Sequence, residues 1–406
     1  MVVALLLPVA LLNYLDRQMV ATMKASMVGD IPTIANKADW GLVLASFKWS
    51  YALLGPIAGY IADRYSRRWV IVGSLFVWSV VTWSTAQATT FNELLTARAF
   101  MGVSEAFYFP AALAMITEYH LGPTRSRAVG LHQTGIYFGQ IFGGFAGYVA
   151  EAPALGWRWA FSASGIVGAL YALPLLALLR DSPDSKRRSL DYARDGTAGT
   201  GVVRGLLGNR NFILLVMCFT LPAIAGWIVR DWMPEILREQ FSLTQGKAGV
   251  SAILFVQIAS LVGAVVGGTV ADRWVRRTPR GRIFTSATGM VLFLPALFSV
   301  GNASSLGIAI VGLVVFGLGW GFFDSNNMPI LSQIARPEWR ATGYGIANLV
   351  SISCGGFGDW AFGALRDRNV PLNLIFGVFA SFALLSVVFI LMIRPRNDVE
   401  RPEAAR

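Results

Sequence analysis

The sequence predicts an all-α membrane protein with twelve transmembrane helices in two pseudo-symmetric six-helix bundles. Three observations lead to this fold class. Of the 406 residues, 55% are hydrophobic and only 14% are charged, whereas soluble domains carry about a quarter charged residues. Apolar segments of about 20 residues, the length that spans a bilayer, follow one another along most of the chain. A ten-residue motif also occurs twice, about half a chain apart, which indicates two duplicated halves.

The first predicted bundle covers residues 1–180 and begins almost at the first residue. A signal peptide is not expected, because the start has no basic region and Asp16 and Arg17 interrupt the apolar run. The apolar runs predict six spanning helices in this half, at 3–24, 40–62, 69–89, 93–118, 125–150 and 157–180.

Residues 181–211 form the longest polar stretch and are expected to link the two bundles. They contain the basic run Lys186-Arg187-Arg188 and several glycines. The second bundle, 212–394, is expected to hold six further spans, and residues 395–406 are expected to form a cytoplasmic tail. Those spans are predicted at 212–235, 247–271, 282–301, 304–333, 338–365 and 371–394.

The distribution of positive charge predicts the orientation in the membrane. The net charge is +11, and most Lys and Arg residues lie in the connections after even-numbered helices, in the linker and in the tail. Membrane proteins keep such residues on the cytoplasmic side. Both termini and the linker are therefore predicted to be cytoplasmic. The same pattern explains the basic composition without a nucleic-acid partner, and the lipid bilayer is the expected surroundings.

The repeated motif lies in the loops that join two pairs of apolar segments. Its copies are Gly59-Tyr-Ile-Ala-Asp63-Arg64-Tyr-Ser-Arg67-Arg68 and Gly268-Thr-Val-Ala-Asp272-Arg273-Trp-Val-Arg276-Arg277. The pattern resembles the loop signature of the major facilitator superfamily, between helices two and three and between eight and nine. The resemblance implies alternating-access transport, a monomer, and a bacterial inner membrane. We expect Asp63, Arg64, Asp272 and Arg273 to latch the two halves; the alternative is that these loops only signal topology.

Charged residues inside two apolar helices are the next candidates for function, because a charge near the bilayer centre costs several kcal/mol. Helix one contains Asp16 and Arg17, and helix four contains Arg98 and Glu105. The helix-four pair lies nearly two turns apart, about 10 Å along one face, too far for direct contact. We therefore expect helix one to supply the opposite charges. A static network that only joins the two helices is the alternative.

The same residues carry a second resemblance. Asn13-Tyr14-Leu15-Asp16-Arg17 with Arg98 and Glu105 on helix four resembles the anion–cation symporter branch of the superfamily, which includes sugar-acid carriers and sialin. Spinster-type lipid transporters share a similar pattern. In the sugar-acid carriers the matching residues imply proton sites at Asp16 and Glu105, substrate contacts at Tyr14 and Arg17, and a coupling role for Arg98.

Further candidate substrate residues lie on helices two, four and five. Lys48, next to Tyr51, would add positive potential for an anion, or would snorkel to the interface. Tyr108 follows Glu105 on helix four. The galactonate carriers have a substrate-binding Gln on helix five where this chain has Ile136. His132 and Gln133 lie nearby instead, and His132 is either a titrating group or a structural one.

Helices seven, ten and eleven supply polar residues in the second half. Trp320, Asn326, Asn327 and Asn348 are expected to form the polyol end of a substrate site, with Trp320 as a stacking platform. The alternative is hydrogen bonding between helices, which such residues often provide. Arg230 and Asp231 near the outer end of helix seven either gate the outer mouth or mark the membrane interface.

These observations predict proton-coupled symport of a small organic anion, of the sugar-acid type, by alternating access. Three alternatives stay open: a spinster-like lysolipid exporter, a proton-coupled carrier of neutral sugars, and a receptor that does not transport. An enzyme is not expected, because the sequence has no nucleotide-binding loop, no H-E-x-x-H motif and no paired cysteine metal motif. No cofactor and no metal are predicted.

Overall fold

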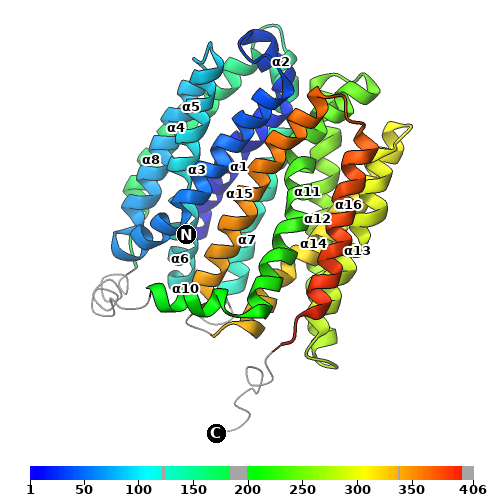
Figure 1. Cartoon of the computed structure of the whole chain (residues 1–406). Helices are drawn as coiled ribbons and strands as arrows, with labels where there is room; N and C mark the ends of the chain where they lie inside the picture. Colours follow the sequence, from blue (N-terminus) through cyan, green and yellow to red (C-terminus); the bar gives the residue numbers. More distant parts are fainter. Residues whose placement is uncertain (121–123, 183–198, 337–338, 396–406) are drawn as a thin grey trace. The chain divides into compact units, whose positions relative to one another are not determined.

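The computed structural model describes residues 1–120, 124–182, 199–336 and 339–395, and all regular secondary structure in them is helical (Figure 1). This agrees with the predicted fold class. Contacts within the chain divide it into two compact units, described separately below. Unit 1 comprises Met1–Thr197, Ile228–Leu254 and Gly355–Asn369. Unit 2 comprises Ala198–Trp227, Phe255–Cys354 and Val370–Arg406.

The helices of the first half all belong to unit 1. They are α1 (Val2–Thr22), α2 (Lys24–Asp30), α3 (Lys37–Arg64), α4 (Arg67–Thr85), α5 (Phe91–Glu105), α6 (Tyr108–Tyr119), α7 (Arg125–Glu151) and α8 (Gly156–Leu178).

Two features of this half differ from the prediction. The short helix α2 was not expected. The single span predicted at 93–118 is two helices, α5 and α6, with a break at Ala106 and Phe107. Pro110 explains the break, because a proline ring clashes with the carbonyl group four residues earlier, here that of Ala106.

The remaining helices are α10 (Gly199–Leu207), α11 (Arg210–Phe241), α12 (Gln245–Val275), α13 (Gly281–Gly301), α14 (Leu306–Ile334), α15 (Arg340–Asp367) and α16 (Leu372–Met392). Parts of α11, α12 and α15 belong to unit 1, and the rest of these helices belongs to unit 2. Helix α10 lies inside the expected linker 181–211, whose residues 183–198 lie outside the described part of the chain, as does most of the expected tail 395–406.

Each of the twelve predicted spans coincides with helical structure. Among the described residues, nine helical segments are long and apolar enough to cross a membrane by length and composition. The hydrophobic pattern therefore predicted the long helices, and it missed the short helices α2 and α10, which lie outside the apolar runs.

Each unit has its own packed interior. In unit 1 the interior side chains come mainly from α1, α4, α6, α7 and α8, and they include Leu6, Leu75, Trp78, Ile116 and Leu175. In unit 2 they come from α10, α11, α13, α14, α15 and α16, and they include Phe212, Ile283, Phe323, Ile330 and Ile390.

Helices α1 and α7 pack closely because α7 presents glycines to α1. A Cβ atom added at Gly135 would lie 2.8 Å from the carbonyl oxygen of Leu7. Gly139 and Gly143 meet α1 in the same way, next to Leu11 and Gln18. Small residues allow such close approach between membrane helices. This packing fixes the rotation of α1, and with it the direction of its polar residues.

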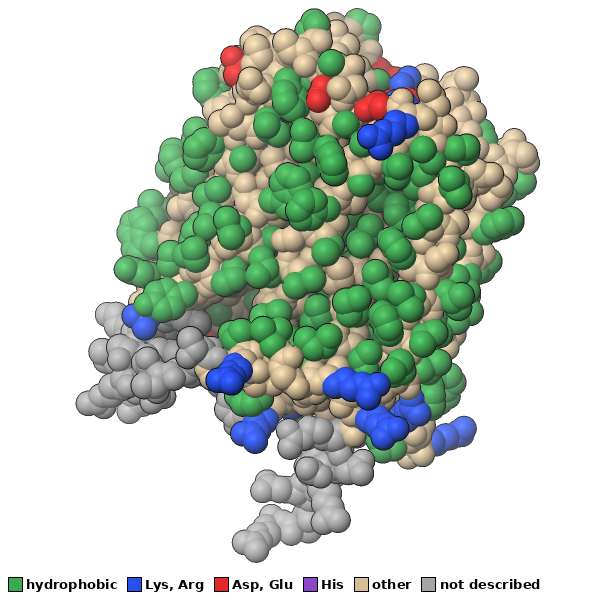
Figure 2. Space-filling view, viewed as in Figure 1, with side chains coloured by type: hydrophobic (Ala, Val, Ile, Leu, Met, Phe, Trp, Pro, Cys, Tyr) green, Lys and Arg blue, Asp and Glu red, His purple; other side chains and the backbone are tan. Residues whose placement is uncertain are grey.

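The surface has the character expected of a membrane protein. Hydrophobic side chains cover much of the long helices on the face shown in Figure 2, and Lys and Arg side chains gather at helix ends near α10. Exposed apolar residues such as Leu170, Leu173 and Val265 reach 59%, 63% and 64% exposure. Such side chains suit contact with lipid.

Candidate functional site

The charged residues of α1 and α5 meet in the interior of unit 1. Arg17 on α1 donates from Nε to Oε2 of Glu105 on α5 over 2.6 Å. The Arg17 side chain is 13% exposed and the Glu105 side chain is fully buried. The structure thus supplies the opposite charge on helix one that the sequence analysis required for Glu105.

Aromatic rings enclose the Arg17 guanidinium group. Its central carbon lies 4.8 Å from the ring centre of Tyr14, 4.7 Å from Phe47 and 4.7 Å from Tyr51. Cation–π attraction stabilises an arginine in such surroundings, more strongly where water is excluded. Two predicted substrate residues, Tyr14 and Tyr51, therefore form the walls around a third, Arg17. Phe47 completes these walls and was not predicted from the sequence.

Asp16 faces away from Arg17, as successive residues on a helix do. Its Oδ2 accepts a hydrogen bond from Thr82 of α4 over 3.1 Å, and its Oδ1 accepts one from Ser164 of α8. Asp16 is 2% exposed, so its carboxyl group is held by hydroxyl groups and not by direct contact with an arginine. Thr82 and Ser164 could not be found from the sequence, because single hydroxyl residues are common in spanning helices.

Arg98 lies deeper in unit 1 and is 2% exposed. Its guanidinium group lies over the Phe47 ring, at 4.7 Å from the ring centre, and donates to the sulfur of Met101 over 3.0 Å. Arg98 interacts electrostatically with Glu105 and Asp16 without direct contact. Arg98 thus interacts with both candidate proton sites, which suits the coupling role predicted for it.

Tyr108 and His132 form a hydrogen-bonded pair between α6 and α7. The Tyr108 hydroxyl lies 2.8 Å from Nε2 of His132 and donates to the carbonyl oxygen of Leu6 on α1 over 3.0 Å. Both side chains are fully buried, and Phe109 packs against both rings. The pair joins three helices, which fits the structural alternative for His132. Ile136 lies in the apolar interior of unit 1.

Gln133 follows His132 on α7 and is half-buried. Its predicted contact with substrate stays a prediction.

Lys48 on α3 does not point to solvent. It is 3% exposed, and its ammonium group forms ion pairs with Asp231 of α11 and Asp359 of α15. All three residues belong to unit 1. Lys48 is therefore neutralised by protein carboxylates in this structure, and snorkelling does not occur.

Further ion pairs join the same parts of unit 1 towards the ends of the helices. Lys24 pairs with Glu235 over 3.1 Å, and Lys37 pairs with Glu239 over 2.8 Å. The backbone N–H groups of Lys37 and Ala38, at the start of α3, donate to the carboxylate of Asp367. These residues belong to the side predicted to be extracellular. On that side, α3 is tied by ionic contacts to α11 and α15.

The candidate residues of the second half lie in unit 2, on α14 and α15. Trp320 packs in a group of aromatic rings with Phe293, Phe316 and Phe323. It is half-buried, and the ring also covers Gly226 of α11. Contacts with these rings and with Gly226 therefore cover much of the Trp320 side chain.

The three asparagines of unit 2 differ in their surroundings. The Asn326 amide donates to the Phe322 carbonyl oxygen over 2.8 Å, within α14. The Asn327 amide donates to Oδ1 of Asp324 over 3.4 Å, one turn earlier on the same helix. Asn348 on α15 is half-buried. The side-chain amides of Asn326 and Asn327, which were predicted to bind sugar hydroxyl groups, thus form hydrogen bonds within α14.

The two copies of the loop motif have different surroundings. In the first copy, Arg64 lies over the ring of Tyr60 at 4.2 Å, and buried Arg67 forms an ion pair with Glu118 of α6. The side chain of Asp63 lies outside the described part of the chain.

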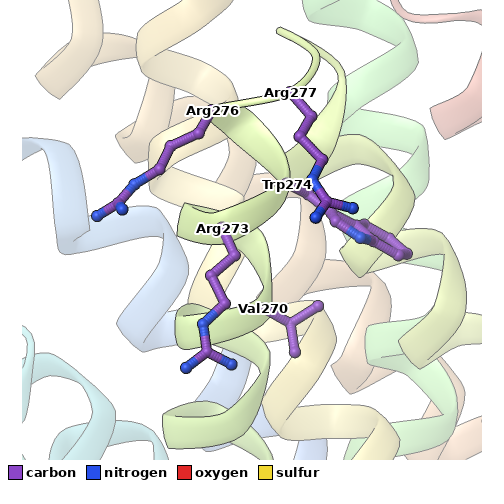
Figure 3. Close-up of a pocket in the computed structure, with 5 residues that line it drawn as sticks. All are labelled: Val270, Arg273, Trp274, Arg276 and Arg277. Atoms are coloured by element: carbon purple, nitrogen blue, oxygen red, sulfur yellow. The ribbon is translucent and has the colours of Figure 1, made fainter.

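In the second copy the charged side chains are exposed. Asp272 has a side chain that is 73% exposed and lies 3.9 Å from Nη2 of Arg282. Arg273 is one of the residues that line a cavity of about 370 Å³ (Figure 3). The residues that line this cavity are Val270, Arg273, Trp274, Arg276 and Arg277.

Comparison with known families identifies the chain. The model of the Major Facilitator Superfamily matches residues 6–359. The chain belongs to this superfamily. It is a membrane transporter with the superfamily's all-helical fold, and transport by alternating access follows from this membership.

Similar proteins place it near the spinster proteins. The chain is 26% identical to protein spinster of Drosophila melanogaster, over 88% of this chain and 60% of that protein. It is 27% identical to protein spinster homolog 1 of Homo sapiens, over 91% of this chain and 73% of that protein. The chain thus spans less than two thirds of the fly protein, and its spinster-like character matches the resemblance seen on helices one and four.

Solved structures share the fold. A bacterial homologue of the human lysosomal transporter spinster, in an inward-facing and unoccupied conformation, has a TM-score of 0.77 at 20% identity, over 97% of this chain and 94% of that chain. A D-xylose–proton symporter has a TM-score of 0.79 at 17% identity, over 98% of this chain and 99% of that chain. At these identities the likeness concerns the fold alone.

Proposed function

We propose that this chain is a proton-coupled transporter of an organic anion, in which Arg17 binds the anion and Glu105 carries the proton. The buried ion pair between Arg17 and Glu105 supports this proposal. Arginine binds carboxylate and phosphate groups through its planar fork. In the present structure Glu105 accepts a hydrogen bond from Nε of Arg17, while the buried Nη2 of Arg17 has no hydrogen-bond partner among the described residues. Glu105 therefore balances the guanidinium charge, and a substrate anion can take this place once Glu105 releases it.

Protonation of Glu105 provides this release. A neutral carboxylic acid no longer balances the Arg17 charge, which then attracts an anionic group from the substrate. An unpaired buried charge is strongly unfavourable, whereas a paired one is tolerated. Proton and anion therefore bind together or leave together. Asp16, held by Ser164 and Thr82, is the second proposed proton site, and Arg98, which interacts electrostatically with both Asp16 and Glu105, transmits the change.

The proposed substrate class is a single-chain phospholipid, a lysophospholipid. Two features support this choice over a sugar acid. Aromatic rings surround Arg17 and offer apolar contact beside one cation, which suits a molecule with a phosphate group and a hydrocarbon chain. The side-chain amides of Asn326 and Asn327 already donate within α14, which leaves fewer donors for sugar hydroxyl groups. Similarity to spinster proteins agrees with this class.

The proposal includes the arrangement of the whole chain in the membrane. Residues 1–180 and 212–394 act as two bundles that move about a central site, with both termini on the cytoplasmic side of a bacterial inner membrane and the protein acting as a monomer. The motif residues Asp63, Arg64, Asp272 and Arg273 act as a cytoplasmic latch that opens during the transport cycle.

Transport by purified protein in proteoliposomes tests the coupling. We expect the native chain to move a labelled lysophospholipid faster when a proton gradient is imposed. Glu105→Gln imitates the protonated state permanently, so this variant should still exchange substrate but should lose at least tenfold of the gradient-driven rate. Arg17→Gln should lose both activities, because the anion then has no partner.

Glu93→Gln is the matched control. It is the same substitution on the same helix, at an exposed residue whose side chain caps α5 together with Thr90, and glutamine also serves in such a capping box. Gradient-driven transport that survives in Glu105→Gln as well as in Glu93→Gln would contradict the coupling role. Transport of glucuronate or galactonate in place of lysophospholipid, with Asn327→Ala raising KM severalfold, would instead favour the sugar-acid class.

A further inference from the structure

A second group of buried charges lies in unit 1, apart from Arg17 and Glu105. It consists of Lys48 on α3, Asp231 on α11 and Asp359 on α15, which are 3%, 8% and 0% exposed. The Lys48 ammonium group donates to Oδ2 of both carboxylates. We call these three residues the outer triad.

The outer triad lies well below the helix ends on the predicted extracellular side. Lys48 is eleven residues after the start of α3, Asp231 is ten residues before the end of α11, and Asp359 is eight before the end of α15. At about 1.5 Å per residue these positions are roughly 12–17 Å from the ends. The exposed pair Lys37–Glu239 joins α3 and α11 closer to those ends. The triad is therefore an ionic link between these helices that lies deeper than the Lys37–Glu239 pair.

The outer triad contains two carboxylates and one ammonium group. If both carboxylates are ionised, one negative charge is left over in a buried site, where an uncompensated charge is strongly unfavourable. The Oδ1 atom of Asp359 is buried and meets no donor at hydrogen-bonding geometry among the described residues, although the Trp232 side chain on α11 interacts with this carboxyl group. This atom is a place where a proton can reside.

Charged groups on the neighbouring helices have partners outside the outer triad. Arg98 on α5 interacts with Asp231, but it also interacts with Glu105 and Asp16, so one cation is shared among three carboxylates. Arg17 on α1 is paired with Glu105. Arg230 precedes Asp231 on α11 and has an interaction of its own, and its backbone carbonyl accepts a hydrogen bond from Gln18 of α1. Lys24 and Arg238 both pair with Glu235, one turn further along α11.

We propose that the outer triad is a second proton-binding site, with the proton on Asp359, and that proton binding there holds the extracellular side closed. With Asp359 protonated, Lys48 and Asp231 form a neutral pair and Asp359 adds a hydrogen bond. Without the proton, the excess negative charge favours separation of α3 from α11 and α15, which hydrates the carboxylates. The inference rests on the proposed proton-coupled transport, because it adds a second proton site to that cycle.

Distance measurements between two spin labels test this inference without substrate or transport. Labels attached at Ala35→Cys, before α3, and Arg368→Cys, after α15, report the separation of the two helix ends in lipid nanodiscs. Cys218→Ala and Cys354→Ala remove the two native thiols. We expect the native triad to give one short distance at acidic pH and an added longer distance at alkaline pH.

Asp359→Asn should keep the short distance at both pH values, because asparagine imitates the protonated acid. Asp231→Asn should do the same, since one carboxylate on Lys48 leaves no excess charge. This second variant keeps the test decisive if Asp359→Asn does not fold. Lys48→Met should give the longer distance even at acidic pH. The control Glu239→Gln removes the exposed link between the same helices and should keep the native pH response.

An unchanged pH response in both Asn variants would overturn the inference. So would a response to sodium concentration at constant pH that replaces the response to protons. If Glu105→Gln abolishes the pH response and the Asn variants keep it, the triad is not a proton site and the proposed function stands. If Glu105→Gln leaves gradient-driven transport intact while the Asn variants lose the pH response, the proposed function fails and the triad remains a proton site.

Discussion

Arg17 and Glu105 offer the sharpest energetic prediction, because each is buried and each is the other's direct ionic partner. With the contacting atoms 2.6 Å apart, the charge centres lie about 4 Å apart, and their attraction is about 4 kcal/mol at the effective dielectric constant usual in proteins. Breaking a buried pair by removing one partner costs about 3–5 kcal/mol, because the other charge is left uncompensated.

We therefore expect Glu105→Ala and Arg17→Met each to lower the free energy of unfolding by about 3 kcal/mol or more. The double variant should lose much less than the sum, since it leaves no unpaired charge. The assay is equilibrium unfolding in detergent micelles, arranged as a double-mutant cycle, with a coupling energy of about 2 kcal/mol or more expected. The cation–π contacts of Arg17 remain in Glu105→Ala and reduce the loss in free energy of unfolding by about 1 kcal/mol.

Additive losses, within about 0.5 kcal/mol, would refute this reasoning. They would mean that Arg17 and Glu105 do not act as a pair in solution, and that the exchange of Glu105 for a substrate anion has no energetic basis.

Three further predictions concern other parts of the protein. Ser164→Ala should lower the gradient-driven transport rate several-fold with little change in exchange, because Asp16 loses a hydroxyl donor that holds it; full gradient-driven activity in proteoliposomes would contradict this. Tyr108→Phe should cost about 1–3 kcal/mol in unfolding experiments, since a buried hydroxyl that bonds His132 and a carbonyl group is lost; an unchanged unfolding midpoint would disagree. Asp272→Asn should leave stability unchanged, because its side chain is largely exposed, but should slow transport if the latch operates; normal rates at normal expression would rule the latch out.

The long helices could be predicted from the sequence because they depend on local composition. A run of about 20 apolar residues predicts a span wherever it occurs, and all twelve predicted spans coincide with helices. The break between α5 and α6 escaped this pattern, because the residues on both sides are apolar. Pro110 was the available signal for it. Helices α2 and α10 were missed because they are short and lie in polar connections.

The candidate site could be predicted in part. Charged residues in apolar helices stand out in any sequence, so Asp16, Arg17, Arg98 and Glu105 were all singled out. Lys48 was also noticed, but as a substrate contact. Neither Asp359 nor Glu235 was given a role from the sequence. Single residues of this kind give no sign of the partner that they will meet.

The class of the protein, the positions of its long helices, the repeated loop motif and the charged residues within apolar helices all follow from the sequence alone. The tertiary structure decided which charges are paired. Arg17 meets Glu105 across 88 residues of sequence, and Lys48 meets Asp359 across 311. The reason is physical: helical periodicity depends on neighbours along the chain, whereas an ion pair between helices depends on how each helix is rotated and packed against the next.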